Sequence, residues 1–245
     1  MEKVGIIAGT GFYSLPALAG NEPRKVTTTY GDALVTSGKW NGIEIEFVTR
    51  HGADHSVPPN KVNYRANITA LKDLGVTRVI AVNVVGGVDP TLKPGDLSLI
   101  DDFIDFTSGR ADTFYDGVQP GGVSHVDVVG AYDKGIRAGL ADAAKKLGLS
   151  LRESGVYAGF NGPRFETPAE IRLAALAGAT VVGMTGCPEV TLAKEANLRY
   201  AAIALVVNPA AGVSDQPITM EDISTCLKQA SVKVIQIIDA AITEI

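Results

Sequence analysis

The sequence is poor in the residue types that build covalent or metal-held scaffolds, with two cysteines and three histidines among 245 residues. Cys187 and Cys226 stand in unrelated contexts without paired spacing, so reduced thiols are expected and a disulfide framework is not. His51, His55 and His125 lack cysteine or carboxylate neighbours at metal-ligand spacing. We therefore expect no bound metal.

Long apolar runs and clusters of one charge are also missing. No stretch approaches the roughly 18 uninterrupted apolar residues that cross a bilayer, and the first apolar run, residues 4–8, is too short for the core of a signal peptide. The net charge is −5, and Lys and Arg form no stripe suited to a phosphodiester backbone. These absences predict a cytoplasmic protein that binds neither membrane nor nucleic acid.

What is present is an apolar, globular composition, with 46% hydrophobic and 20% charged residues. Short runs of Val and Ile alternate with helical patterns, which is typical of an α/β domain around a largely buried sheet. We expect one domain over residues 1–245. Asn41-Gly42 lies between two apolar runs and predicts an antiparallel hairpin, so the central sheet should be mixed and flanked by helices.

The expected elements follow from these periodicities and from turn residues. Residues 105–132 are polar and rich in glycine, which predicts a long excursion with a functional or interface role. Strands are expected at residues 4–8, 33–39, 43–49, 78–85, 96–100, 152–157, 180–184 and 201–207, and helices at 63–74, 133–147, 168–177, 188–196 and 220–242.

Small and polar residues follow four of the predicted strands, at residues 9–11, 50–52, 83–87 and 183–186. Open α/β sheets bind ligands at the carboxyl ends of their strands, so these turns should converge. The guanidinium of Arg50 offers a planar fork that suits phosphate. Together the four turns predict an anion pocket.

Each turn taken singly has a simpler interpretation. A dinucleotide site would need a third glycine where the sequence has Ser14, which disfavours a nicotinamide cofactor. A plain tight turn at residues 9–11, a surface Arg50 beside a loop-capping His51, and ordinary loops after the other two strands remain alternatives.

Further motifs accompany these turns along the chain. They are Gly9-Thr10-Gly11, Arg50-His51-Gly52, residues 61–67, Lys93-Pro94-Gly95-Asp96, residues 114–117, Gly162-Pro163-Arg164-Phe165-Glu166-Thr167, and Pro188-Glu189-Val190 with Ala193-Lys194-Glu195. In this order and spacing, from about residue 4 to residue 228, they resemble the signatures of the trimeric nucleoside phosphorylases. That family includes methylthioadenosine phosphorylase and the 6-oxopurine phosphorylases.

The resemblance implies a nucleoside and orthophosphate as co-substrates, no cofactor, and a homotrimer. It also implies roles for particular residues. The phosphate site would comprise Thr10, Arg50, His51, the backbone at Val84, and Thr185; Asn83 and Met184 would lie near the sugar, and Phe165 would stack on the base.

The base is addressed by two further positions. Adenine-specific members of the family carry an Asp-x-Asp pair after the last core strand, whereas this sequence has Asn208, Pro209 and Ala210. Members that take 6-oxopurines resemble this chain in having an asparagine there and a glutamate after the stacking phenylalanine, here Glu166. A 6-oxopurine presents O6 as acceptor and N1–H as donor, which suits an amide and a carboxylate. Asn208 as a turn residue and Glu166 as a charge at a helix N-terminus are the alternatives.

The 5′ end of the nucleoside is less defined by the sequence. Inosine and guanosine phosphorylases place a histidine there, but none follows His125, and Met220 and Ile223 occupy the region. A thioether and an alkyl group suit a methylthio substituent, although both residues could equally be core positions. His125 matches a histidine that a neighbouring subunit lends in methylthioadenosine enzymes. We favour S-methyl-5′-thioinosine as substrate, with inosine, guanosine and methylthioadenosine as alternatives.

The expected catalytic residues are Asn208, Glu166 and Arg50. Asn208 would hydrogen-bond N7 and O6 as charge builds on the leaving purine, Glu166 would hold N1–H, and phosphate held by Arg50 would stabilise the cationic sugar. A hydrolytic nucleosidase and a non-catalytic purine-binding protein are the competing functions.

Overall fold

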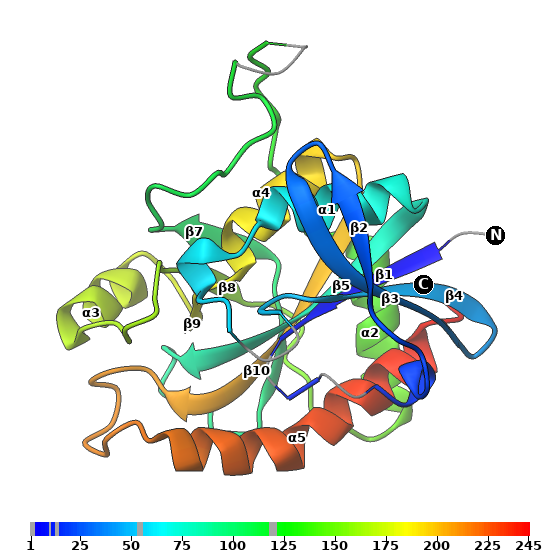
Figure 1. The fold of residues 1–245 in the computed structure, drawn as a ribbon. Helices are drawn as coiled ribbons and strands as arrows, with labels where there is room; N and C mark the ends of the chain where they lie inside the picture. The colour runs from blue at the N-terminus through cyan, green and yellow to red at the C-terminus, as the bar shows by residue number, and fades with distance from the viewer. Residues whose placement is uncertain (1–2, 10, 13–14, 53–55, 118–121) are drawn as a thin grey trace.

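The computed structural model describes residues 3–9, 11–12, 15–52, 56–117 and 122–245. In these residues the strands form one mixed sheet in the order β2-β3-β4-β1-β5-β9-β8-β7, with β10 paired to both β5 and β6 (Figure 1). The strands are β1 (Lys3–Ala8), β2 (Arg24–Thr28), β3 (Gly31–Trp40), β4 (Ile43–Thr49), β5 (Val76–Gly87), β6 (Leu97–Leu99), β7 (Asp102–Asp105), β8 (Val156–Gly159), β9 (Val181–Gly183) and β10 (Arg199–Pro209).

The centre of the sheet consists of parallel strands. β1 pairs in parallel with β4 and with β5, and β5 pairs in parallel with β10. Helices cover both faces of such strands, so their sequences read as nearly continuous apolar runs. In β10 the nine residues 200–208 are all buried, as this position requires.

Helices pack on both faces of the sheet (Figure 1). Helices α2 and α5 share a core with one face, α1 and α4 share a core with the other, and α3 covers a smaller cluster near β8 and β9. Side-chain caps from Asn63, Asp133, Thr167 and Thr219 begin four of these helices. The helices are α1 (Tyr64–Asp73), α2 (Lys134–Lys146), α3 (Pro168–Leu176), α4 (Gly186–Glu195) and α5 (Met220–Ala241).

The predicted hairpin is confirmed, because β3 and β4 pair antiparallel around Asn41 and Gly42, whose φ angles are 49° and 83°. Each predicted strand and helix overlaps an observed one. Two short strands, β2 and β7, were not predicted. β2 is an edge strand with charged and exposed residues, and β7 begins and ends with aspartate. Neither sequence has the apolar periodicity of a buried strand, so these strands are recognised only by their backbone pairing.

The predicted long excursion is confirmed over residues 106–131, which carry no helix or strand where the structure describes them. It projects from the body at the top of Figure 1. The carboxylate of Glu195 anchors its base by accepting hydrogen bonds of 2.7 Å from the Thr113 hydroxyl and from the Phe114 N–H. Further out, Val123 and Val129 are strongly exposed.

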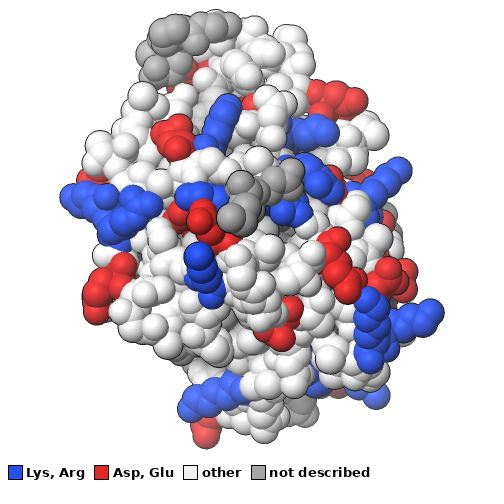
Figure 2. Space-filling view, turned by 90° about the vertical axis from the view of Figure 1, so that its right-hand side faces the viewer, with Lys and Arg blue, Asp and Glu red and all other residues white. Residues whose placement is uncertain are grey.

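Surface charge is mixed on the face shown in Figure 2, where Lys and Arg side chains are interspersed with Asp and Glu. Of the helices in the described residues, none is long and apolar enough to cross a membrane. That the protein binds no nucleic acid stays a prediction.

Candidate active site

One cavity, of about 600 Å³, gathers most of the predicted site residues. It lies where β1, β4 and β9 end and beside the later halves of β5 and β10, so the four predicted segments converge, although residues 83–87 are part of β5 and not a turn after it. The predicted residues that line it are Arg50, His51, Val84, Phe165, Glu166, Met184, Thr185, Asn208, Met220 and Ile223. Thr10 is outside the described residues.

Arg50 follows β4 and is held by a carboxylate that received no role in the sequence analysis. Its Nε donates to Oε2 of Glu189 at 2.8 Å, and its Nη2 donates to Oε1 at 2.9 Å. The Tyr200 hydroxyl donates to the same Oε1 at 2.7 Å. Glu189 belongs to the motif Pro188-Glu189-Val190 and has apolar neighbours on a predicted helix. A glutamate in such a place is seldom buried without a cationic partner, and this could have identified Glu189 as the partner of a buried cation.

This pair changes the electrostatics expected of the anion site. Burial by itself would lower the pKa of Arg50, but the adjacent Glu189 carboxylate outweighs burial and holds the pKa above its ordinary value. Arg50 is therefore a cation whose charge Glu189 already balances. An anion in the cavity meets a neutral ion pair and a set of hydrogen-bond donors, rather than an isolated positive charge.

Thr185 directly precedes α4 and lines the cavity. Its hydroxyl oxygen accepts a hydrogen bond of 3.1 Å from Nδ2 of Asn83, which leaves the hydroxyl hydrogen for another acceptor. The backbone N–H groups of Thr185 and Gly186 donate to the Tyr157 hydroxyl, each at 3.0 Å, so the hydroxyl of Thr185, and not its N–H, is the donor that this turn offers.

Asn83 does not line the cavity, since it is almost fully buried behind Thr185. Its observed contact is the support of the Thr185 hydroxyl. The predicted contact of Asn83 with a sugar stays a prediction.

His51 lies on the same side of the cavity as Arg50, close against the backbone of Gly9. Nδ1 of His51 is 2.9 Å from the Val57 carbonyl oxygen, which can only accept, so Nδ1 carries the hydrogen. A Cβ atom added at Gly9 would come within 2.8 Å of Cδ2 of His51. The glycine at position 9 therefore allows the imidazole to reach the cavity wall.

Glu166, Asn208 and Phe165 also line this cavity. Glu166 is 8% exposed, and among the described residues its Oε1 has no hydrogen-bond partner. Burial raises the pKa of its carboxyl above the ordinary value. A buried acceptor without a partner costs about 1–3 kcal/mol.

Asn208 has one amide hydrogen already engaged. Its Nδ2 donates to the Pro209 carbonyl oxygen at 2.7 Å, which fixes which end of the amide is the nitrogen. Phe165 is 42% exposed and presents its ring at the cavity. An amide, a carboxyl and an aromatic face thus lie together, as the recognition of a planar heterocycle requires.

The two candidate residues for the 5′ side differ in burial. Met220, the first residue of α5, is 65% exposed, which removes the interpretation that it is a core residue. Ile223 is 8% exposed and belongs to the core shared with α5, yet it also lines the cavity. Met184 is a third apolar side chain in the lining of the cavity.

His125 does not reach the cavity of its own chain. It is exposed and lies in the projecting segment of residues 106–131. The predicted role of His125 would need a second copy of the chain and stays a prediction.

Arg110 is a further residue that the sequence analysis missed. It lies near the base of the projecting segment and donates to the carbonyl oxygens of Phe160 (3.2 Å), Asn161 (3.0 Å) and Met184 (2.8 Å), and to that of Cys187. It thereby ties this segment to the turn that carries Met184. A lone arginine in a polar stretch gave no signal of this contact set.

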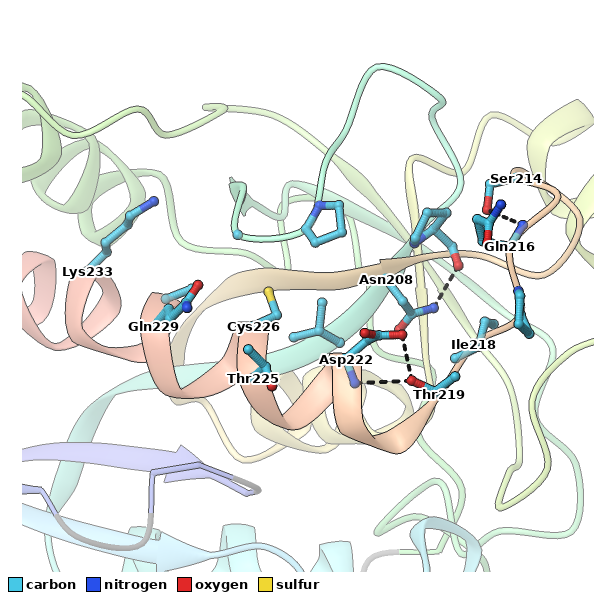
Figure 3. Close-up of a pocket in the computed structure, with 16 residues that line it drawn as sticks. Asn208, Ser214, Gln216, Ile218, Thr219, Asp222, Thr225, Cys226, Gln229 and Lys233 are labelled. Atoms are coloured by element: carbon cyan, nitrogen blue, oxygen red, sulfur yellow. Dashed lines mark hydrogen bonds between the residues drawn. The ribbon is translucent and has the colours of Figure 1, made fainter.

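A second cavity, of about 750 Å³, adjoins the first between α5 and the loop that follows β10. Figure 3 shows Thr225, Cys226 and Gln229 of α5 on one side of it and Gln216 and Ile218 of the loop on another. Val207, Asn208 and Ile218 line both cavities. Asn208 therefore lies in the wall between them.

Within the described residues, no group of three or more His, Cys, Asp or Glu side chains is arranged to hold a metal ion. That the protein needs neither metal nor cofactor stays a prediction.

Comparison with known proteins supplies the family context. The model of the phosphorylase superfamily matches residues 3–243. A 6-oxopurine nucleoside phosphorylase from Pyrococcus furiosus is 44% identical, with 99% of this chain and 92% of the relative covered. A probable S-methyl-5′-thioinosine phosphorylase from Methanopyrus kandleri is 41% identical at the same coverage. Among solved structures, methylthioadenosine phosphorylase from Schistosoma mansoni in complex with adenine is similar, with a TM-score of 0.92, 33% identity, and coverage of 99% of this chain and 91% of that one.

Proposed function

This chain belongs to the phosphorylase superfamily and is an enzyme, a pentosyltransferase, and on that premise we propose that it splits 6-oxopurine nucleosides with orthophosphate. The observation that carries the proposal is the buried Oε1 of Glu166, which has no partner among the described residues and lies in the same cavity as Asn208, Arg50 and Thr185. The names of the relatives from Pyrococcus furiosus and Methanopyrus kandleri support the same substrate class.

The phosphate side of the proposal uses Arg50, His51, the backbone at Val84, and Thr185, and by resemblance Thr10. A phosphate oxygen attacks C1′ of the sugar, and the bond from C1′ to N9 breaks as the purine leaves with the bonding electrons. The negative charge of phosphate stabilises the oxocarbenium-like sugar, so no covalent enzyme intermediate is required.

The base side uses Glu166, Asn208 and Phe165. The ionised Glu166 accepts the N1–H of a 6-oxopurine, and the second amide hydrogen of Asn208 donates to O6 or N7 as charge develops on the base. Adenine presents the reverse polarity at N1 and at position 6. A mismatch at one buried group costs about 1–3 kcal/mol, which favours hypoxanthine and guanine nucleosides.

For the 5′ substituent we propose methylthio over hydroxyl. Met220, Ile223 and Met184 offer apolar contact there, and a hydroxyl would find no hydrogen-bond partner among these three side chains. S-methyl-5′-thioinosine is therefore the proposed substrate, with inosine and guanosine as weaker ones.

A second candidate is methylthioadenosine phosphorylase, which is favoured by the raised pKa of Glu166. A protonated carboxyl can donate to N1 of adenine, and Oδ1 of Asn208 can accept from the 6-amino group. This second candidate predicts that kcat/KM for methylthioadenosine increases as pH falls through the pKa of Glu166.

The active form is proposed to be a cytoplasmic homotrimer in which His125 of one copy completes the 5′ side of the next. The projecting segment supports this, because its base is anchored while its outer valines are exposed. Mass measurement in solution, together with a His125→Ala variant, tests it. A fully active monomer would contradict the shared site.

The deciding experiment measures the turnover of methylthioinosine, inosine, guanosine and methylthioadenosine with and without phosphate. We expect phosphate-dependent turnover with the highest kcat/KM for methylthioinosine. Equal turnover without phosphate would indicate a hydrolase, and binding without turnover a non-catalytic protein.

A further inference from the structure

The guanidinium of Arg50 is almost fully committed to protein acceptors. Nε and Nη2 donate to Glu189, Nη2 also lies 3.5 Å from the Ile7 carbonyl oxygen, and Nη1 donates to the Val82 carbonyl oxygen at 3.1 Å. A guanidinium has five N–H groups, so these contacts leave one on Nη1. That nitrogen lies beside Gly9 on the cavity wall, 3.8 Å from where a Cβ of residue 9 would stand.

We propose that Glu189 is the positioning residue of the orthophosphate site, since its carboxylate fixes the guanidinium of Arg50 so that one Nη1–H faces the bound anion. The inference rests on the proposed function and adds to it a residue that does not itself line the cavity.

The geometry supports a directing role for the carboxylate. Both oxygens of Glu189 engage the same edge of the guanidinium, and a bidentate pair fixes orientation as well as position. The two carbonyl oxygens, of Ile7 and Val82, contact only the terminal nitrogens. Without Glu189, Nε would have no acceptor among the contacts described.

Tyr200 in turn fixes Glu189. Burial, and next the Glu189 charge, raise the pKa of the Tyr200 phenol well above its ordinary value, so the hydroxyl remains protonated and donates to Oε1. Glu189 comes from α4, Tyr200 from β10 and Arg50 from the end of β4. The direction of one anion-binding group thus depends on the packing of three elements.

The test is a Glu189→Asp variant, which keeps the charge but draws the carboxylate back by one methylene, on the order of 1.5 Å. Glu46→Asp is its matched control, because Glu46 is also a buried carboxylate, lies on β4, and contacts Lys3 and Ser37 without lining the cavity. Three quantities are measured: KM for phosphate, KM for the nucleoside, and the shift of the unfolding midpoint caused by inorganic phosphate alone.

For Glu189→Asp we expect phosphate KM to rise at least tenfold, nucleoside KM to stay within twofold, and the phosphate-induced shift to shrink. Glu46→Asp should change each KM by less than twofold. Tyr200→Phe keeps the ion pair and removes one hydrogen bond, so phosphate KM should rise by a smaller factor, roughly 2- to 10-fold.

A folded Glu189→Asp enzyme with phosphate KM within twofold of the parent, or with both KM values raised equally, would overturn the inference. If Glu189→Asp does not fold, Tyr200→Phe provides the test. A rise in phosphate KM that exceeds the rise in nucleoside KM supports the inference, and equal changes of the two KM values overturn it. Failure of the proposed function is a separate result, because the parent and Glu46→Asp would then also show no response to phosphate.

Discussion

The side chains of Arg50 and Glu189 are 2% and 1% exposed, and they meet through a 2.8 Å contact between Nε and Oε2. A cation and an anion are thus buried together beside the cavity. Arg50 directly follows β4 and Glu189 lies on α4, so the ion pair joins the end of a central strand to a helix that covers the sheet. Replacing one partner would leave the charge of the other buried without a counter-charge.

Arg50→Ala should therefore lower stability as well as activity. Removing one member of a buried ion pair typically lowers the free energy of unfolding by about 3–5 kcal/mol. The double variant Arg50→Met with Glu189→Leu should recover much of that loss, since apolar replacements of similar volume leave no buried charge. Urea unfolding measures both variants. The double variant should still lack saturation by phosphate, and an Arg50→Ala protein as stable as the parent would show that Glu189 finds another partner.

Thr185→Val should weaken phosphate binding without altering the fold. The substitution keeps the shape of the side chain and removes the hydroxyl that Asn83 orients. Loss of a hydrogen bond to a charged group costs about 1.5–3 kcal/mol, so phosphate KM should rise roughly 10- to 150-fold. Thr185→Ser retains the hydroxyl and should stay within a few fold. Equal kinetics for the two variants would exclude the hydroxyl as an anion donor.

Asn208→Asp should narrow the preference for methylthioinosine over methylthioadenosine. An aspartate there places an oxygen against the Pro209 carbonyl oxygen, where Nδ2 now donates, and that contact favours a protonated carboxyl. The proton is directed to Pro209, and the other oxygen can accept from the 6-amino group. The ratio of kcat/KM values should therefore fall, and fall further at lower pH.

Asn208→Ala is the control for that change, because it removes the amide and adds no titratable group. Its ratio should show no additional dependence on pH. Full reversal of the preference is not expected for Asn208→Asp while Ala210 lacks a carboxylate and Glu166 remains.

Glu166→Gln should separate stability from activity. Burial raises the pKa of Glu166, so the folded state disfavours the ionised carboxyl. As pH rises from the ordinary range of a glutamate through the raised value, the parent should lose stability that the glutamine variant keeps. Unfolding midpoints across this range should show the variant more stable above it, with the difference disappearing below it.

Activity of Glu166→Gln should move the other way. The amide oxygen can still accept N1–H but carries no full charge, so kcat/KM for methylthioinosine should fall roughly 10-fold or more. In the stability measurement, an equal dependence of the unfolding midpoint on pH in the parent and in Glu166→Gln would show that Glu166 does not cause the pH dependence.

Much of the fold followed from local pattern. The apolar runs of β1, β5 and β10 are long because both faces of the sheet are covered, and such runs are readable without coordinates. Edge strands such as β2 carry no comparable signal, since one side of their backbone and most of their side chains meet water.

The sequence by itself placed Arg50 directly after β4 and Asn208 near the end of β10, and therefore at one end of the sheet. This holds because β4, β1, β5 and β10 are parallel, and the carboxyl ends of neighbouring parallel strands share an edge. Thr185 follows β9, which pairs antiparallel with the end of β5, so the tertiary structure decided its place. Only the tertiary structure decided how these groups are charged and directed. Glu189, 139 positions from Arg50, neutralises it, Asn83 turns the Thr185 hydroxyl, and Pro209 takes one amide hydrogen of Asn208. Such contacts depend on the directions in which side chains from different layers point toward one another. The periodicity of strands and helices in the sequence does not give these directions.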